Sequence, residues 1–191
     1  MAQIVAAARE PAIGAMRLLW WRDALVRLDS AGAAVPAEPL LAAVADRLMT
    51  AGLSGEELSA IEEGWAALLE EEEPGEAQII AHAEHRGAPL FALAARLLGS
   101  VPGDIGHAGE GWALADLGHR LSTSAARGFA RSLAAERLAD VDIARWPAAL
   151  RPLGLLVVLA RRDTAMPADS LRRQGSPRRL LRALAYRLSG R

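Results

Sequence analysis

The sequence contains no cysteine, no lysine and no asparagine, and only nine of its 191 residues are aspartate. The absence of cysteine excludes disulfides, thiolate metal sites and a cysteine nucleophile. All 22 basic residues are therefore arginine, a bias that is typical of a GC-rich genome. Because aspartate is scarce, chemistry that needs clustered aspartates has few positions in which to occur.

Long apolar runs are absent as well. The most apolar stretch, Leu153 to Ala160, has about eight residues, whereas a membrane-spanning helix needs about 20. The N-terminus has no basic segment followed by an apolar one, so the sequence predicts no signal peptide. We therefore expect a cytoplasmic protein.

Alanine and leucine dominate the residues that are present. The chain has 42 alanines and 30 leucines but only 18 β-branched residues, and 52% of it is hydrophobic. Alanine and leucine favour helices, whereas β-branched residues favour strands. A chain of this length and apolar content buries a sizeable core and is not disordered overall. The composition predicts an all-α protein in which residues 1–191 form a single domain, a bundle of about eight helices.

Four segments have apolar residues at three- and four-residue steps, as expected of helices with one buried face. These stripes are Leu40, Leu41, Val44 and Leu48; Leu58, Ile61, Trp65, Leu68 and Leu69; Leu90, Ala94, Leu97 and Leu98; and Leu180, Leu181, Leu184 and Leu188. Ser54 and Glu57 form a capping-box pattern before the second stripe. Ser176 followed by Pro177 starts the last one. The glycine-rich stretch 99–111 is interpreted as a connection between helices.

Charge is distributed unevenly along the chain. Residues 56–76 hold nine glutamates and no arginine, which we interpret as a solvated helix face and loop. Residues 161–191 hold nine arginines against Asp163 and Asp169, a local balance of +7. The C-terminal part of the chain is therefore expected to attract anionic partners.

The last predicted helix, residues 176–190, concentrates this basic charge. It carries Arg178, Arg179 and Arg182, and its other face carries leucines. Such a helix fits an anionic lipid surface, an acidic partner or phosphate groups, so peripheral contact with the inner membrane is one expectation. The alternative is a helix packed on the core with its arginines in solvent. Nucleic acid is not an expected partner, because Tyr186 is the only aromatic residue among these arginines.

Residues 10–25, EPAIGAMRLLWWRDAL, form the most distinctive stretch of the chain. They predict a helix in which Trp20 and Trp21 anchor a core or groove, with Arg17 and Arg22 at its edge. The Trp-Trp-Arg string resembles the segment that follows the first aspartate-rich helix in the squalene and phytoene synthase family. This resemblance implies the all-α isoprenoid synthase fold.

The resemblance covers nearly the whole chain, although it begins partway into the family pattern. Residues 86–99 are similar to the family's mid-chain helix that ends in glycine, and residues 108–114 continue the match. Residues 145–147 and 151–154 are similar to degenerate members of the family. The family's opening helices have no counterpart in this sequence.

Family members condense two prenyl diphosphates head to head. Mg²⁺, held by two aspartate-rich motifs on facing helices, neutralises the diphosphate leaving group. Three residues without acidic side chains stand where the first motif has acids: Ala2, Gln3 and Ala6. In the second motif, Asp116 stands at an asparagine position and His119 at an arginine position. Arg120 replaces the metal-binding aspartate, and a cation there repels Mg²⁺.

The resemblance therefore implies the fold of the family without its reaction. No cofactor or metal is expected, and the role becomes binding of a lipid-like ligand or of a protein partner. Complex I assembly factors in this family likewise keep the fold without the aspartates. A remnant of the prenyl cavity is expected among Arg17, Trp20, Trp21, Trp112, Asp116, His119 and Arg120. The alternative is an active Mg²⁺-dependent prenyltransferase whose N-terminal part was lost to a misplaced start codon.

Three smaller motifs have simpler interpretations. His82 and His85 lie three residues apart without a third ligand in view, so we interpret them as surface histidines near a helix end rather than as a metal site. Asp116 and His119 share one helix face, where they form either an acid–base pair or, by preference, a salt link. Residues 122–124, Ser-Thr-Ser, predict a helix cap.

Overall fold

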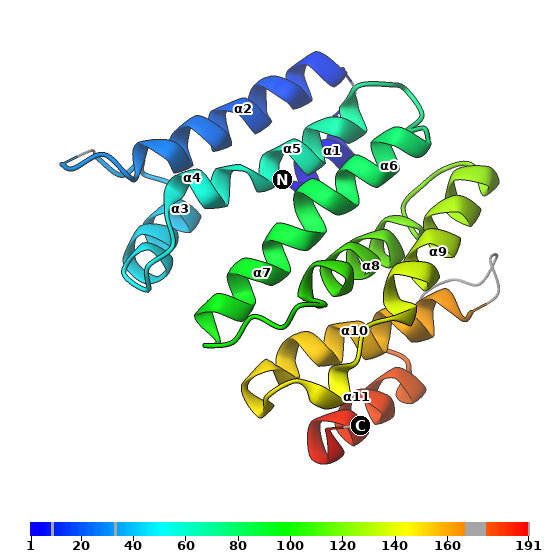
Figure 1. The fold of residues 1–191 in the computed structure, drawn as a ribbon. Helices are drawn as coiled ribbons and strands as arrows, with labels where there is room; N and C mark the ends of the chain where they lie inside the picture. Colours follow the sequence, from blue (N-terminus) through cyan, green and yellow to red (C-terminus); the bar gives the residue numbers. More distant parts are fainter. Residues whose placement is uncertain (9, 33, 167–174, 191) are drawn as a thin grey trace.

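The abundance of helix-forming residues determines the secondary structure. The computed structural model describes residues 1–8, 10–32, 34–166 and 175–190, and every regular element in these ranges is a helix (Figure 1). The all-α prediction is therefore confirmed. The first half contains α1 (Ala2–Ala7), α2 (Pro11–Arg27), α3 (Pro39–Ala43), η1 (Val44–Met49), α4 (Gly55–Ser59), α5 (Ile61–Ala66), η2 (Ala67–Leu69), α6 (Glu76–His82), η3 (Ala83–Gly87) and α7 (Ala88–Leu97).

A central helix, α8, connects the two halves of the molecule. The second half contains α8 (Ile105–Leu117), α9 (Ser124–Ala139), η4 (Ile143–Arg145), η5 (Ala148–Leu150), α10 (Arg151–Thr164) and α11 (Pro177–Ser189). Helix α8 packs against η3 and α7 from the first half and against α9 and α10 from the second. Helices α2 and α11 lie at opposite ends of the molecule (Figure 1). Within the described residues, no helix combines the length and apolarity required to cross a membrane.

Glycines bring α8 into direct backbone contact with η3. A Cβ atom at Gly109 would meet the carbonyl group of Gly87, and a Cβ atom at Gly87 would meet that of Gly109. The interpretation of residues 99–111 as a connection was therefore wrong for its second part, because α8 begins at Ile105. The glycines of α8 serve close packing between helices rather than a turn.

Helix starts follow the predicted capping patterns. The Ser54 hydroxyl accepts a hydrogen bond from the Glu57 N–H at 3.1 Å, and the Glu57 carboxylate accepts one from the Ser54 N–H at 2.9 Å. Thr123 caps α9 by accepting from the N–H of Ala126 at 3.3 Å. Ser176 caps α11, with Pro177 in its first turn. The capping box and both other caps are confirmed.

Two predicted apolar stripes are less buried than expected. In α7 the fully enclosed side chains are Phe91 and Ala95, whereas Leu97 is exposed. In α3 and η1 only Leu41 is buried, and Leu40 is exposed. Alanine-rich helices have apolar residues on several faces, so neighbouring helices decide which face becomes the core.

Helix α11 packs on α10 with its leucines facing solvent. Tyr186 is its buried residue and packs against Gly154 of α10, where a side chain would overlap the phenol group. The four leucines of the predicted stripe, Leu180, Leu181, Leu184 and Leu188, are exposed. Helix α11 packs on α10 through Tyr186 and Arg179 rather than through the leucines, while Arg178 and Arg182 are exposed, so the alternative of a core-packed helix holds only in part.

Candidate functional site

An arginine lies between two indole rings in the interior of the molecule. The guanidinium carbon of Arg86 lies 4.4 Å from the ring centroid of Trp65 and 4.7 Å from that of Trp112. Arg86 comes from η3, Trp65 from α5 and Trp112 from α8. Stacking of a buried guanidinium on indoles is a cation–π interaction that strengthens with desolvation. We call Trp65, His82, Arg86, Trp112, Asp116 and Arg120 the arginine cluster.

A chain of hydrogen bonds runs through this cluster. The Arg86 Nη1 group donates to Nε2 of His82 at 3.2 Å, and Nδ1 of His82 donates to the Gly64 carbonyl at 2.5 Å. Because an arginine is only a donor, His82 must be neutral and carry its proton on Nδ1. Burial, together with the charge of Arg86, lowers the pKa of His82 to about 4. Burial also lowers the pKa of Arg86 to about 10, although Asp116 opposes this effect.

The carboxylate of Asp116 lies between two guanidinium groups. Its Oδ2 atom is 3.2 Å from Nη2 of Arg120 and 3.8 Å from Nη2 of Arg86. Asp116 and Arg120 are two of the residues that the resemblance described above would align with the family's second aspartate-rich motif. Mg²⁺ prefers several carboxylate and water oxygens, and here two cations already flank the carboxylate. The side chains at this position therefore do not fit a magnesium site. Among the residues that the structure describes, no three metal-ligating side chains come together.

Local sequence spacing explains how the cluster assembles. His82 and Arg86 are four residues apart, as are Asp116 and Arg120, so each pair shares a helix face. Gly64 allows α5 to approach η3, because a Cβ atom at this position would lie 2.6 Å from the backbone nitrogen of Arg86. The close approach of α5 and η3 at Gly64 thus brings the Arg86 guanidinium against the ring of Trp65.

Three members of this cluster were not predicted as site residues: Trp65, which was expected only in an apolar helix stripe, His82 and Arg86. His82 was interpreted as a surface residue, but it is buried, and its neighbour His85 is the exposed one. That interpretation was wrong for His82 because the approach of Gly64 encloses its ring. Arg86 was not among the predicted site residues. The available signal was the four-residue step from His82 to Arg86, which puts the two side chains on one helix face.

A second feature is an apolar groove beside Trp21. Its volume is about 470 Å³. Its walls come from α2, α3, η1, α4, α5 and the N-terminal residue: Met1, Trp21, Leu25, Leu40, Ala43, Val44, Arg47, Leu48, Leu58 and Ile61. Arg47 is the only charged side chain among these residues, and 82% of it is exposed. We call this the Trp21 groove.

The predicted remnant cavity is therefore divided. Trp21 lines the groove, whereas Trp20 is 44% exposed. The two indole rings pack edge to face, with their centroids 5.4 Å apart. Arg17 is exposed on α2. Trp112 and Asp116 line a separate crevice of about 30 Å³ next to α10 and α11. His119 is half-buried just beyond α8, and Arg120 reaches back to Asp116.

These features define an all-α protein with an arginine-centred polar cluster in its core and an apolar groove on its surface. Comparisons with protein families, with curated proteins and with solved structures find no match for this chain. The roles of the groove and of the arginine cluster therefore follow from their own chemistry.

Proposed function

We propose that this chain is a noncatalytic helical module that binds a lipid-like ligand with an apolar chain and an anionic head. The observation that carries the proposal is the Trp21 groove. The resemblance to the squalene and phytoene synthase family supports it, since members of that family bind prenyl chains. The assembly-factor branch of that family supports a role without catalysis.

The groove has the size and lining that such a ligand requires. Its volume of about 470 Å³ falls within the range of small-molecule sites, about 300–1,000 Å³. Each methylene group moved out of water contributes about 0.8 kcal/mol, so a chain of about ten carbons contributes roughly 8 kcal/mol before the entropic cost of association. Arg47 provides a cation at the mouth for the anionic head.

The absence of catalysis rests on charge at the position of the second motif. Ionisation of a prenyl diphosphate requires a cation cluster held by carboxylates. Asp116 is instead paired with Arg120 and Arg86. This arrangement favours a structural role for Asp116 over metal binding.

Calorimetry with two amphiphiles tests the proposal. Farnesyl diphosphate without Mg²⁺ and palmitate are each titrated into the wild type and into the variant Ala43→Trp. Ala43 lines the groove, so the larger side chain should fill it while the other lining side chains remain. Ala42→Trp is the matched control, because Ala42 is the exposed neighbour of Ala43 on α3 and does not line the groove. We expect binding of at least one amphiphile, with a loss of about tenfold or more in Ala43→Trp only. Equal affinity in all three proteins would overturn the groove as the site.

Two further outcomes separate the alternatives. If neither amphiphile binds, the lipid-like ligand is wrong and the protein-partner alternative is favoured. Incubation of the wild type with farnesyl or geranylgeranyl diphosphate and Mg²⁺ tests the prenyltransferase alternative. Turnover that a chelator abolishes would establish that alternative and overturn the noncatalytic proposal.

A further inference from the structure

Helix α11 presents a row of leucines to solvent. Leu180, Leu181, Leu184 and Leu188 are between 52% and 76% exposed. At about 100° per residue, these four positions form one stripe about 100° wide along the helix. A contiguous stripe of exposed leucines differs from the scattered apolar residues of an ordinary surface, and it marks an interaction site.

The opposite face of α11 fixes this orientation. Tyr186 lies about half a turn from the stripe and is buried against Gly154. Arg179, on the same side, forms an ion pair with the buried carboxylate of Asp163. Both contacts hold the helix to α10, so the stripe faces outward as a consequence of packing.

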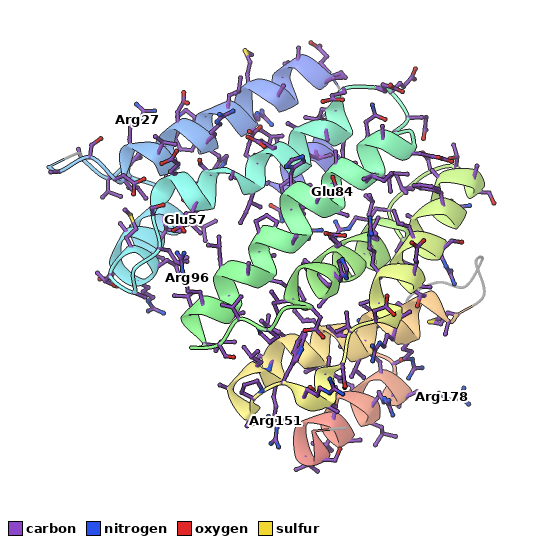
Figure 2. The ribbon with its side chains drawn as sticks, viewed as in Figure 1. Arg27, Glu57, Glu84, Arg96, Arg151 and Arg178 are labelled. Carbon is purple, nitrogen blue, oxygen red and sulfur yellow. The ribbon has the colours of Figure 1, made fainter. Side chains whose placement is uncertain are left out.

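Arginines flank the leucines on both sides. Arg178 lies beside one edge of the stripe and Arg187 beside the other, whereas Arg182 lies further round the helix, toward the side of Tyr186; all three are exposed. Figure 2 shows Arg178 at the outer edge of α11. No acidic residue occurs between positions 177 and 189. Of the three arginines predicted to form a basic patch, Arg179 is therefore engaged with Asp163, while Arg178 and Arg182 remain on the surface.

A basic cleft opens next to the same helix. It has a volume of about 560 Å³ and lies between η4, α10 and the end of α11, with Arg161, Arg162 and Arg182 in its wall. Arg161 donates to the carbonyls of Leu138 and Val141, which fixes its position. Asp142 also lines the cleft, and its carboxylate pairs with Arg145 at 3.0 Å. The cleft therefore carries a net positive charge, and its residues from α11 and its C-cap, Arg182 and Gly190, lie on the side of Tyr186 rather than on the leucine stripe.

We propose that α11 docks this protein onto the surface of an anionic lipid bilayer. The helix lies in the plane of the interface, with the leucine stripe among the acyl chains and Arg178 and Arg187, beside its two edges, at the level of the phosphates. The basic cleft adds a longer-range attraction to the anionic surface. Both components of interfacial binding, an apolar face and cationic edges, are present on one rigid helix.

Charge argues against a second copy of the chain as the occupant. Two α11 helices packed through their leucines would bring Arg178 and Arg187 of each copy together without an acidic residue on that helix. Such like-charge contacts oppose association. An anionic bilayer satisfies the leucines and the arginines at the same time.

The test is flotation with vesicles of two compositions. One is pure phosphatidylcholine, and the other contains phosphatidylcholine and phosphatidylglycerol in equal parts. We expect wild-type protein to float with the anionic vesicles and to dissociate as salt increases. Leu184→Gln/Leu188→Gln and Arg178→Gln/Arg187→Gln should each weaken binding about tenfold or more. The control Leu97→Gln/Val101→Gln removes exposed apolar residues elsewhere and should bind like the wild type.

The design separates folding, self-association and the proposed function from membrane docking. The substituted leucines are exposed, so circular dichroism should show unchanged melting for all variants. Equal binding to both vesicle types, or binding that the leucine variant retains, would overturn the proposal. So would light scattering that shows a wild-type dimer and a monomeric leucine variant. The Trp21 groove shares no residue with α11, so Ala43→Trp should float normally and failure of one proposal leaves the other intact.

Discussion

The Nη2 atom of Arg86 lies 3.8 Å from Oδ2 of Asp116, and the two side chains are only 9% and 14% exposed. The pair crosses from η3 to α8, the two elements whose backbones touch at Gly87 and Gly109. A buried ion pair is costly to break from one side, because the remaining charge loses its partner without returning to water. The ion pair of Arg86 with Asp116 therefore lies at the same η3–α8 contact that holds the core together.

Substitutions at Arg86 should be more harmful than those at Arg120. We expect Arg86→Ala to lower the free energy of unfolding by about 3–5 kcal/mol, since Asp116 and His82 both lose a partner. Arg120→Ala should cost less than about 1 kcal/mol, because Arg120 is half exposed and Arg86 remains beside Asp116. Arg86→Lys should fall between them, as an ammonium cannot stack between two indoles. Urea unfolding measures all three, and equal costs for Arg86→Ala and Arg120→Ala would contradict the prediction.

His82 should make stability depend on pH. Its pKa is lowered from 6.5 to about 4 in the folded protein, so the unfolded chain binds the proton more tightly. The free energy of unfolding should therefore be unaffected by His82 above about pH 6.5 and fall by roughly 3 kcal/mol between pH 6.5 and pH 4.

The variant His82→Gln isolates this effect, because glutamine retains a donor and an acceptor but does not titrate. Burial raises the pKa of Glu62, which contributes with the opposite sign, so the measured quantity is the difference between wild type and variant. Parallel curves for wild type and His82→Gln would exclude His82 as the titrating group.

The ion pair between Glu57 and Arg96 links α4 to the end of α7. Nη1 of Arg96 donates to Oε1 of Glu57 and Nη2 donates to Oε2, both at 2.6 Å. Both residues are labelled in Figure 2. Glu57 also completes the capping box with Ser54, and hydrogen bonds from Arg96 and Ser54 lower its pKa to about 2. Both side chains are partly exposed, so Arg96→Ala should lower the melting temperature only slightly.

Glu57→Ala should cost about 1 kcal/mol more than Arg96→Ala, because it also removes half of the capping box. A double-mutant cycle on thermal unfolding separates the two contributions. Arg96→Ala made in the Glu57→Ala background should have little further effect. A full additive cost in that background would show that the ion pair does not contribute.

The same substitution should have opposite effects at two helical glycines. Gly128→Ala, in α9 with no neighbouring atom near the new Cβ, should raise stability by about 1 kcal/mol. Gly154→Ala should lower it by about 1–3 kcal/mol, because the new methyl group overlaps the phenol of Tyr186. Tyr186→Phe should relieve part of that loss in the double variant. Melting temperatures of the variants measure both effects. A Gly154→Ala variant that melts at a higher temperature than the wild type would contradict the close contact between Gly154 and Tyr186.

Local signals predicted much of the secondary structure. The Ser54–Glu57 capping box, the Thr123 cap and the Ser176–Pro177 start all lie where the sequence placed them. Each of these interactions joins residues within about four positions, so it depends on backbone geometry that the local sequence already defines. The fold class follows for the same reason, since alanine and leucine favour helices at nearly every position.

The site depended on contacts that sequence spacing does not reveal. The predicted cavity combined Trp21 with Trp112 and Asp116, but α2 and α8 place them in separate depressions. His82 was expected on the surface until the approach of Gly64 enclosed it. Such contacts join residues far apart in the chain. They form only in the folded protein, where helices cross closely at glycines such as Gly64 and Gly109.

The sequence by itself determined that this protein is helical, where several helices begin, and that its last helix has a leucine stripe beside arginines. Tertiary structure alone decided which face of that helix packs against the core and which faces solvent. A pattern of leucines specifies an apolar face but not its partner. Gly154 leaves room for Tyr186, and Asp163 holds Arg179, so these contacts direct the leucines away from the core.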